Sequence, residues 1–333
     1  MNLKYLSILL TDRCSAACRI CCFQCNPHNT FVMDESVMKR YIDEAARIGT
    51  VQSINFTGGE AMLYPDLLKK MVQYAMEKHN LPSSVVSNGF WAADEQRGRK
   101  LIRELLECGL KAIRLSADRY HQEFVPPSTL KKAIRILFEA GLLEDISVMD
   151  TKGGPNIRFV TENLRPEIYL VPKISLYPAL LPEKTLTNAE LDVGPADLLM
   201  PTPWDQCYCE DNSGVVLYKD GYIYNCCSQF AFEIPRLRLG KIGEITLAEA
   251  CKKVNRDPIL EIMRRDSVSW FARKALERNL DVQRKEAYSG SCELCRDMLC
   301  NRNLMEELTP LAQEEVWKRR LEKIWGMDGK EHE

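Results

Sequence analysis

The sequence predicts an α/β fold, in which a partial (β/α)6 barrel is followed by a smaller cysteine-bearing module. Two observations support this prediction. Strand-like apolar segments alternate with amphipathic helical segments from residue 3 to residue 176, which is typical of parallel strands joined by helical crossovers. The 14 cysteines fall into two groups, at residues 14–25 and 207–300, with Cys108 alone between them. We therefore expect a TIM-like barrel and a second site built from cysteines.

Each element of the barrel is indicated by its local pattern. The predicted strands and helices are as follows: strands at residues 3–11, 53–59, 83–89, 111–118, 144–150 and 167–176; helices at residues 34–49, 64–78, 94–109 and 128–141. Asp34 can cap the first helix, whose apolar residues repeat on one face. Pro65 suits the first turn of the second helix, while Gly109 and Gly141 suit the ends of the third and fourth.

The alternation of strands and helices stops near residue 176, and the rest of the chain has a different character. A stretch rich in proline and turn residues comes first, and residues 214–227 then alternate around Asp220 and Gly221 like a β-hairpin. The predicted regions are the barrel at 1–176, an irregular linker at 177–205, the cysteine-bearing module at 206–301 and a C-terminal helix at 302–333.

The composition excludes several classes of protein. The net charge is −2, so neither nucleic acid nor an anionic membrane is an expected partner. No segment approaches the roughly 20 apolar residues of a membrane span, and the N-terminus lacks a signal-peptide pattern. We therefore expect a cytoplasmic protein. Because disulfides are rare in the cytoplasm, 14 cysteines favour ligation of metals or iron–sulfur clusters.

Three cysteines with the spacing CxxxCxxC follow the first predicted strand. They are Cys14, Cys18 and Cys21. A barrel places the carboxyl ends of its strands at the active site, and three thiolates can hold a [4Fe–4S] cluster while one iron keeps an open position. A fourth thiolate, from Cys22 or Cys25, could instead close the site.

Further motifs follow the next three strands. TGGE ends the second strand, SNG the third and LSAD the fourth. Together with CxxxCxxC, they resemble the radical S-adenosylmethionine (SAM) superfamily over about residues 3–175; one departure is Ile20, where the family usually has an aromatic residue. The resemblance assigns these residues to the SAM site: Gly58, Gly59, Glu60, Ser87, Asn88, Ser116 and Asp118.

This resemblance implies a role for each part of the SAM site. The glycine pair would permit close backbone approach, and Glu60 would bind the amino group of SAM. Ser116 would contact the ribose or carboxylate, and Asp118 would line the pocket. Two simpler interpretations stay open, since SNG could be a plain turn and Asp118 a helix cap. In this family, a reduced cluster cleaves SAM to a 5′-deoxyadenosyl radical that removes a hydrogen atom from an unactivated C–H bond, so a reductant such as flavodoxin or ferredoxin is an expected partner.

The second group of cysteines resembles the auxiliary-cluster modules called SPASM and twitch. The shorter twitch type, which holds one [4Fe–4S] cluster, fits the number of cysteines better. Together with the cluster of the first site, the whole chain would then hold two [4Fe–4S] clusters. A zinc ribbon is the simpler alternative, since CxxC pairs bind zinc well. The predicted ligands are Cys209, Cys226, Cys292 and Cys295, with Cys207 and Cys300 in reserve.

Cys227 directly follows Cys226, a predicted cluster ligand, and is not itself among the predicted ligands. The chain resembles the YydG-type peptide epimerases, in which a radical takes a Cα hydrogen from a ribosomally made precursor peptide and a cysteine returns hydrogen from the opposite face. This resemblance makes Cys227 the donor, with Asp211 preferred over Asp205 and Asp220 as the carboxylate beside it. Peptide cross-linking, through a thioether or C–C bond, and other oxidative reactions are the alternatives.

Overall fold

The computed structural model describes most of the chain. The described residues are 2–150, 156–178, 203–209, 213–226, 228, 230–280, 288 and 290–325. Among them, no helix is both long enough and apolar enough to cross a lipid bilayer.

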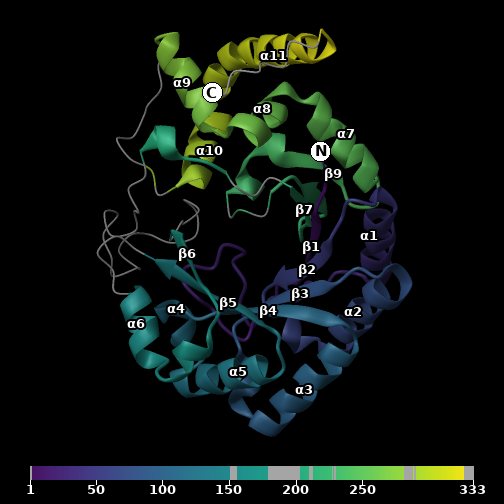
Figure 1. The fold of residues 1–333 in the computed structure, drawn as a ribbon, viewed down its shortest axis with the longest axis vertical. Coiled ribbons are helices and arrows are strands. Elements are labelled where there is room, and N and C mark those ends of the chain that lie inside the picture. The colour runs from purple at the N-terminus through teal and green to yellow at the C-terminus, as the bar shows by residue number, and fades with distance from the viewer. Residues whose placement is uncertain are drawn as a thin grey trace.

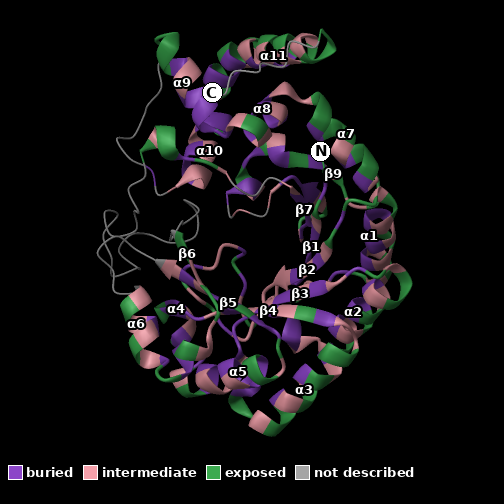
Figure 2. Cartoon of the chain, viewed as in Figure 1, coloured by how far each residue is buried: buried purple, intermediate pink, exposed green. Residues whose placement is uncertain are grey.

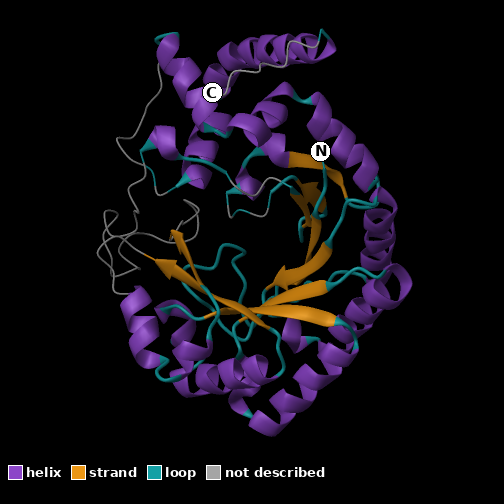
Figure 3. Ribbon diagram, in the orientation of Figure 1, coloured by secondary structure: helices purple, strands orange, loops and turns teal. Residues whose placement is uncertain are grey.

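A single curved sheet of nine strands organises the described part of the chain (Figures 1 and 3). The order is β6-β5-β4-β3-β2-β1-β7-β8-β9. The pairings from β6 through to β7 are parallel, whereas β7–β8 and β8–β9 are antiparallel. The strands are β1 (Tyr5–Thr11), β2 (Ser53–Gly58), β3 (Ser83–Ser87), β4 (Leu110–Ser116), β5 (Leu143–Asp150), β6 (Ile174–Pro178), β7 (Gly214–Leu217), β8 (Tyr222–Tyr224) and β9 (Arg238–Lys241).

Helices cover the outer, convex face of the barrel sheet (Figure 1). They are α1 (Glu35–Ile48), α2 (Pro65–His79), α3 (Glu95–Glu107), α5 (Pro127–Glu139) and α6 (Asn156–Asn163), whereas the short α4 (Arg119–Gln122) follows the carboxyl end of β4. As expected, Asp34 caps α1 through the backbone N–H groups of Ser36 and Val37. Pro65 begins α2. Local sequence signals therefore place the helix ends well.

Side chains on the outer face of the barrel strands are mainly apolar, and those on the inner face are more polar. In β4, Ile113 and Leu115 are fully buried. Because side chains alternate along a strand, Arg114 and Ser116 point to the opposite, inner face. Figure 2 shows buried residues concentrated in the strands and exposed residues on the outer helices. The core thus lies between the sheet and its helices, and the concave side is left for ligands.

The C-terminal part adds further helices, which lie above the sheet in Figure 1. Within the described residues they are α7 (Leu247–Arg256), α8 (Pro258–Asp266), α9 (Ser269–Glu277), α10 (Ser291–Cys300) and α11 (Arg302–Ile324). α11 packs on α8 and α9, and two ion pairs join it to α8: Arg319–Asp266 at 2.6 Å and Arg320–Glu261 at 2.7 Å.

The predicted fold class is confirmed, and several element predictions need correction. The sixth strand was expected over 167–176, but Glu167–Leu170 is a 3-10 turn and the strand is Ile174–Pro178. Pro172 lacks the N–H that a strand ladder needs, so pairing begins after it. Helix α6, between β5 and β6, was not predicted.

The hairpin is confirmed, because β7 and β8 pair antiparallel across a turn in which Gly221 has φ 83°. Its position was not foreseen. β7 pairs in parallel with β1, so the hairpin extends the barrel sheet. The last helix was expected within residues 302–333, and it begins at Arg302 with Pro310 inside it. The boundaries of the four regions stay predictions.

Candidate functional site

The first cysteine loop and the strand-end motifs meet around one cavity. The loop follows β1, and the cavity of about 170 Å³ lies at the carboxyl ends of β1 to β5. Its lining includes these predicted residues: Cys14, Cys18, Cys21, Gly58, Gly59, Ser87, Asn88, Ser116 and Asp118. Residues that are far apart in the sequence are therefore brought together as expected for a barrel active site.

The two glycines let the cysteine loop lie directly against the end of β2. The N–H of Gly59 donates to Thr11 O at 2.7 Å, and the N–H of Glu60 donates to Arg13 O at 2.9 Å. A Cβ on Gly59 would lie 2.1 Å from Arg13 O, and one on Gly58, where φ is 134°, would lie 2.2 Å from Thr11 O. Only glycine fits at such a backbone contact.

Glu60 does not line the cavity but lies fully buried behind it. Its carboxylate accepts hydrogen bonds from the backbone N–H of Asn88 at 2.7 Å, the hydroxyl of Ser87 at 3.2 Å and the N–H of Met62 at 3.2 Å. Burial raises the pKa of Glu60 to about 7, although these hydrogen bonds oppose the rise. In this arrangement Glu60 ties the ends of β2 and β3 together, and its role toward an amino group stays a prediction.

The thiols of the first loop lie in contrasting environments. Burial raises the pKa of Cys14 to about 12, and its sulfur accepts from Ala16 N–H at 3.4 Å and Asn88 Nδ2 at 3.7 Å. Hydrogen bonding from Cys25 lowers the pKa of Cys21 to about 6, and the backbone N–H of Cys25 lies 3.3 Å from the Cys21 sulfur. Cys25 itself is buried. The loop therefore already offers donors for charged thiolates.

The donor set fits an iron–sulfur cluster. No three His, Cys, Asp or Glu side chains among the described residues are grouped so as to hold a single metal ion. A cluster carries its thiolates on separate irons, so its ligands lie farther apart than the ligands of one zinc ion. Three soft thiols around an enclosed cavity meet that requirement.

Two residues at the end of β5 also line the cavity and were missed by sequence reasoning. They are Ser147 and Met149. The Ser147 hydroxyl is buried and has no hydrogen-bond partner within the described part of the chain, so it offers a polar contact to a ligand. Its position at the end of a predicted barrel strand was the available signal.

Asp118 combines the two roles that sequence analysis treated as alternatives. It caps α4, because Oδ1 accepts from the backbone N–H groups of Tyr120 and His121 at 3.0 Å each. It also lines the cavity, and its Oδ2 lies 3.4 Å from the N–H of Met149. Its carboxylate is 1% exposed. The residue thus links the ends of β4 and β5 at the cavity.

The four predicted ligands of the second site line one small, largely apolar void. Cys209 follows the 3-10 turn Trp204–Gln206, Cys226 follows β8, and Cys292 and Cys295 lie one turn apart on α10. Phe230, Ile234 and Met263 close the void, whose volume is about 30 Å³. Burial raises the pKa of Cys295 well above its usual range. Four thiols that line one void supply the number of ligands that a [4Fe–4S] cluster needs.

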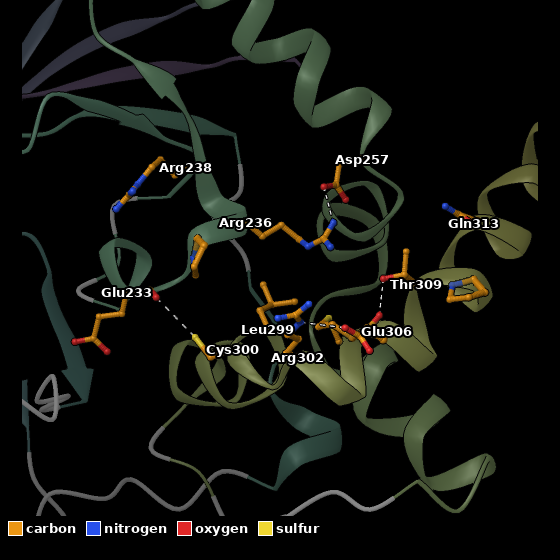
Figure 4. Close-up of a pocket in the computed structure, with 13 residues that line it drawn as sticks. Glu233, Arg236, Arg238, Asp257, Leu299, Cys300, Arg302, Glu306, Thr309 and Gln313 are labelled. Carbon is orange, nitrogen blue, oxygen red and sulfur yellow. Dashed lines mark hydrogen bonds and ion pairs between the residues drawn. The ribbon is translucent and has the colours of Figure 1, made fainter.

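The two reserve cysteines do not line this void. The sulfur of Cys207 lies 3.5 Å from Pro203 O. Cys300 faces Glu233 O at 3.8 Å and lines a wider cavity of about 1080 Å³ (Figure 4). Charged side chains in that cavity pair with one another, as Arg236 does at 2.7 Å with Asp257, the N-cap residue of α8. Both nevertheless lie near enough to predicted ligands to interact electrostatically, Cys207 with Cys292 and Cys300 with Cys295, so the choice of ligands stays a prediction.

The proposed hydrogen donor Cys227 and its partner Asp211 lie outside the described residues. Of the two other carboxylates considered, Asp205 is exposed, whereas Asp220 accepts hydrogen bonds from Tyr224 Oη at 2.5 Å and the Tyr222 N–H at 3.1 Å. Asp220 is therefore engaged in the hairpin turn.

An aromatic cluster connects the first cysteine loop to the β7–β8 hairpin, and sequence reasoning did not predict it. Tyr218 stacks on Phe232 with ring centroids 3.7 Å apart, and Phe23 of the cysteine loop packs on both rings. Lys219 Nζ donates to Phe23 O at 2.8 Å and lies 3.4 Å from an Asp12 carboxylate oxygen. The first loop thus rests on the hairpin that leads to Cys226.

Comparisons with known proteins agree with this geometry. Residues 8–150 match the Radical SAM superfamily. The "Putative peptide biosynthesis protein YydG" of Bacillus subtilis (strain 168) is 27% identical over 299 residues, covering 88% of this chain and 91% of that protein. The GTP 3′,8-cyclase of Clostridium perfringens (strain SM101 / Type A) is 28% identical over 129 residues, covering 37% of this chain and 36% of that protein.

Solved structures show the same fold. Native anSMEcpe with bound AdoMet aligns with a TM-score of 0.52 and 12% identity, covering 95% of this chain and 99% of that one. The same protein with bound AdoMet and Cp18Cys peptide gives a TM-score of 0.51 and 13% identity, again covering 95% and 99%. At these identities the likeness concerns the fold, and it extends over 95% of this chain.

Proposed function

We propose that this chain, whose residues 8–150 form a radical SAM domain, is an enzyme that converts L-residues of a ribosomally made peptide to D-residues. The observation that carries the proposal is the cavity in which the CxxxCxxC loop meets the ends of β2 to β5. The likeness to YydG over 91% of that protein's length supports a peptide as substrate.

The residues around the cavity would hold one [4Fe–4S] cluster and SAM. When bound, this pair supplies a carbon-centred radical able to remove a hydrogen atom from an unactivated C–H bond. Cys14, Cys18 and Cys21 would be the cluster ligands. The glycine pair at the end of β2 keeps the loop close to the sheet, while the Ser147 hydroxyl, which has no partner among the described residues, would contact a ligand. The enclosed position excludes water from a reactive species.

The second void would hold an auxiliary [4Fe–4S] cluster on Cys209, Cys226, Cys292 and Cys295. Cys227 directly follows one of these ligands in the sequence. A thiol at this position can donate a hydrogen atom, because an S–H bond is weaker than most C–H bonds.

Epimerisation then leaves the peptide unchanged in mass and redox state. The peptide loses the Cα hydrogen on one face and receives a hydrogen atom from Cys227 on the other, so configuration inverts. The sulfur radical left on Cys227 takes one electron and one proton to restore the thiol, and Asp211 would assist this proton transfer. A flavodoxin or ferredoxin would supply the electrons, and one SAM is consumed per turnover.

The test is anaerobic turnover of a candidate precursor peptide with SAM and dithionite in D₂O. We expect a gain of one mass unit per modified residue, because the thiol of Cys227 exchanges with solvent, and loss of this product in Cys227→Ala. The matched control is Cys251→Ala, since Cys251 lies in α7 and lines neither site. A peptide that loses two mass units would mean oxidation, and cross-linking would replace the proposal.

A further inference from the structure

An ion pair lies on the inner face of the barrel sheet, next to the first cavity. Arg114 Nε donates to Oδ1 of Asp145 at 2.6 Å, and the Ser175 hydroxyl donates to Oδ2 of the same carboxylate at 2.5 Å. Arg114 is paired in register with Val86, which lines the cavity. Asp145 stands two residues before Ser147, which also lines it. Because paired residues of neighbouring strands share one face of a sheet, the ion pair borders the space of the proposed reaction.

The ion pair leaves part of the Arg114 guanidinium available. The side chain of Asp145 is 1% exposed, whereas that of Arg114 is 33% exposed. A guanidinium carries five N–H donors, of which Nε serves Asp145 and Nη2 lies 3.5 Å from a carboxylate oxygen of Glu144. Nη1 has no acceptor within the described part of the chain. Asp145 therefore holds the guanidinium in place while donors are left over for a ligand.

A second donor lies on the same face, on β2. Asn55 is paired in register with Ser84 of β3, and it stands two residues before Thr57, which lines the cavity. Its Oδ1 accepts from the hydroxyls of Ser84 at 2.8 Å and Ser53 at 3.3 Å. These contacts fix the amide, and its Nδ2 has no acceptor among the residues that the structure describes. The inner face thus presents donors from two strands, β2 and β4.

The charges around these donors favour an uncharged acceptor. Asp145 balances the charge of Arg114, and Glu144 adds a further negative charge beside Nη2. Glu144 would repel a carboxylate placed here, which offsets the attraction of Arg114. A carbonyl oxygen carries no net charge and needs only a donor. The arrangement therefore suits carbonyl groups better than acidic side chains.

We propose that Arg114 and Asn55 bind backbone carbonyl groups of the peptide beside the residue that reacts. This inference deepens the proposed function and rests on it. Epimerisation takes place at a backbone atom, so the enzyme has to hold the backbone itself. A peptide that enters the cavity also loses water from its carbonyl groups, and a buried carbonyl without a donor is costly. Donors on the inner face of the sheet would meet that cost.

The test is binding of a fluorescein-labelled candidate precursor peptide, the same one used for turnover, to the reconstituted full chain, measured by fluorescence anisotropy. Arg114→Lys keeps a charge to balance Asp145 but loses the planar set of donors. We expect about tenfold weaker binding, as for the loss of one hydrogen bond from a charged donor. Asn55→Asp keeps an acceptor for Ser84 but replaces the Nδ2 donors with an oxygen, so it should also weaken binding about tenfold.

The matched control is Arg135→Lys. Arg135 also pairs with a buried carboxylate, that of Glu167, and its side chain is 42% exposed, but it lies on α5 outside the barrel sheet. This variant should leave peptide binding unchanged. A second probe identifies the acceptor: the same peptide, with its acidic side chains and C-terminal carboxylate converted to amides, should show the same tenfold loss in Arg114→Lys.

Unchanged binding in either Arg114→Lys or Asn55→Asp, at full iron content, would overturn the inference. An equal loss in Arg135→Lys would also overturn it, as would a loss in Arg114→Lys that disappears with the amidated peptide, since Arg114 would then bind a carboxylate. If Arg114→Lys does not reach full iron content, the result for Asn55→Asp decides. Failure of the proposed function is distinguishable, because the parent protein would then not epimerise the peptide, whereas failure of this inference alone leaves epimerisation intact.

Discussion

The contact between Gly59 and the cysteine loop makes Gly59→Ala a sensitive test of how the first site is built. A Cβ at this position would lie 2.1 Å from Arg13 O and 2.5 Å from Arg13 C, both backbone atoms. Because an ordinary carbon–oxygen contact is about 3.3 Å or more, the two segments would have to separate by roughly 1 Å. That movement disrupts the hydrogen bonds at 2.7 and 2.9 Å that join them.

The magnitude follows from these losses. Each hydrogen bond contributes about 0.5–1.5 kcal/mol net, and forcing extra volume into a packed position costs about 1–3 kcal/mol. We therefore expect a local destabilisation of about 2–6 kcal/mol. The separation falls on the cavity itself, so Gly59→Ala should lose the first cluster and SAM binding while the second cluster remains.

The assay is iron and sulfide content after anaerobic reconstitution, together with the change in the cluster signal when SAM is added. Gly59→Ala should hold about half the iron of the parent protein, because one of two [4Fe–4S] clusters is lost. Gly141→Ala is the control: its φ of 67° makes alanine unfavourable, but nothing lies within 4 Å of the added Cβ. It should cost about 1–2 kcal/mol of stability and keep all iron. Full iron and normal SAM binding in Gly59→Ala would refute the reasoning.

Three other predictions concern the remaining contacts. Lys219→Met removes the 2.8 Å hydrogen bond to Phe23 O and should shorten the lifetime of the first cluster in air severalfold, measured by loss of its absorbance; an unchanged lifetime would contradict the link. Cys292→Ala should remove about half of the iron, whereas Cys207→Ser should remove none, and the reverse result would reassign the ligands. Burial alone would raise the pKa of Asp43, but hydrogen bonds from a histidine, a tyrosine and a lysine outweigh it and hold the pKa at about 2. Because this pKa is below the ordinary value of about 3.9, the ionised Asp43 carboxylate stabilises the fold above about pH 4, and this stabilisation is lost as the pH falls toward 2. Asp43→Asn should therefore lower the free energy of unfolding by about 1–2 kcal/mol at pH 7 and by less at pH 3.

Local patterns predicted most of the barrel, because the signals that end strands and helices act over a few residues. The motif after each of the first four strands was placed correctly at the cavity for this reason. The sixth strand was misplaced since proline at 172 interrupts a segment that is otherwise apolar enough for a strand. The 3-10 turn before it has no comparable local signal.

Contacts between distant segments were harder to predict. The pairing of β7 with β1 joins residues about 200 positions apart, and no local pattern encodes a partner. The same holds for His121, which lines the cavity together with Cys18 only after β4 and α4 are in place. Glu60 was identified from its motif, but the direction of its carboxylate depends on the buried N–H of Asn88, which sequence alone does not position.

The shared sheet restricts how a substrate can reach the radical site. In β1, residues Tyr5 to Ile8 are in continuous register with Gly214 to Leu217 of β7. A hinge-like opening between the barrel and the hairpin would have to break this ladder, and it would also expose the Tyr5 ring that packs where Gly214 has no side chain. The hairpin therefore behaves as a fixed wall of the barrel rather than as a swinging lid. In the proposed function the peptide would enter beside this wall, and substitutions that loosen the ladder should disrupt both sites together instead of widening access.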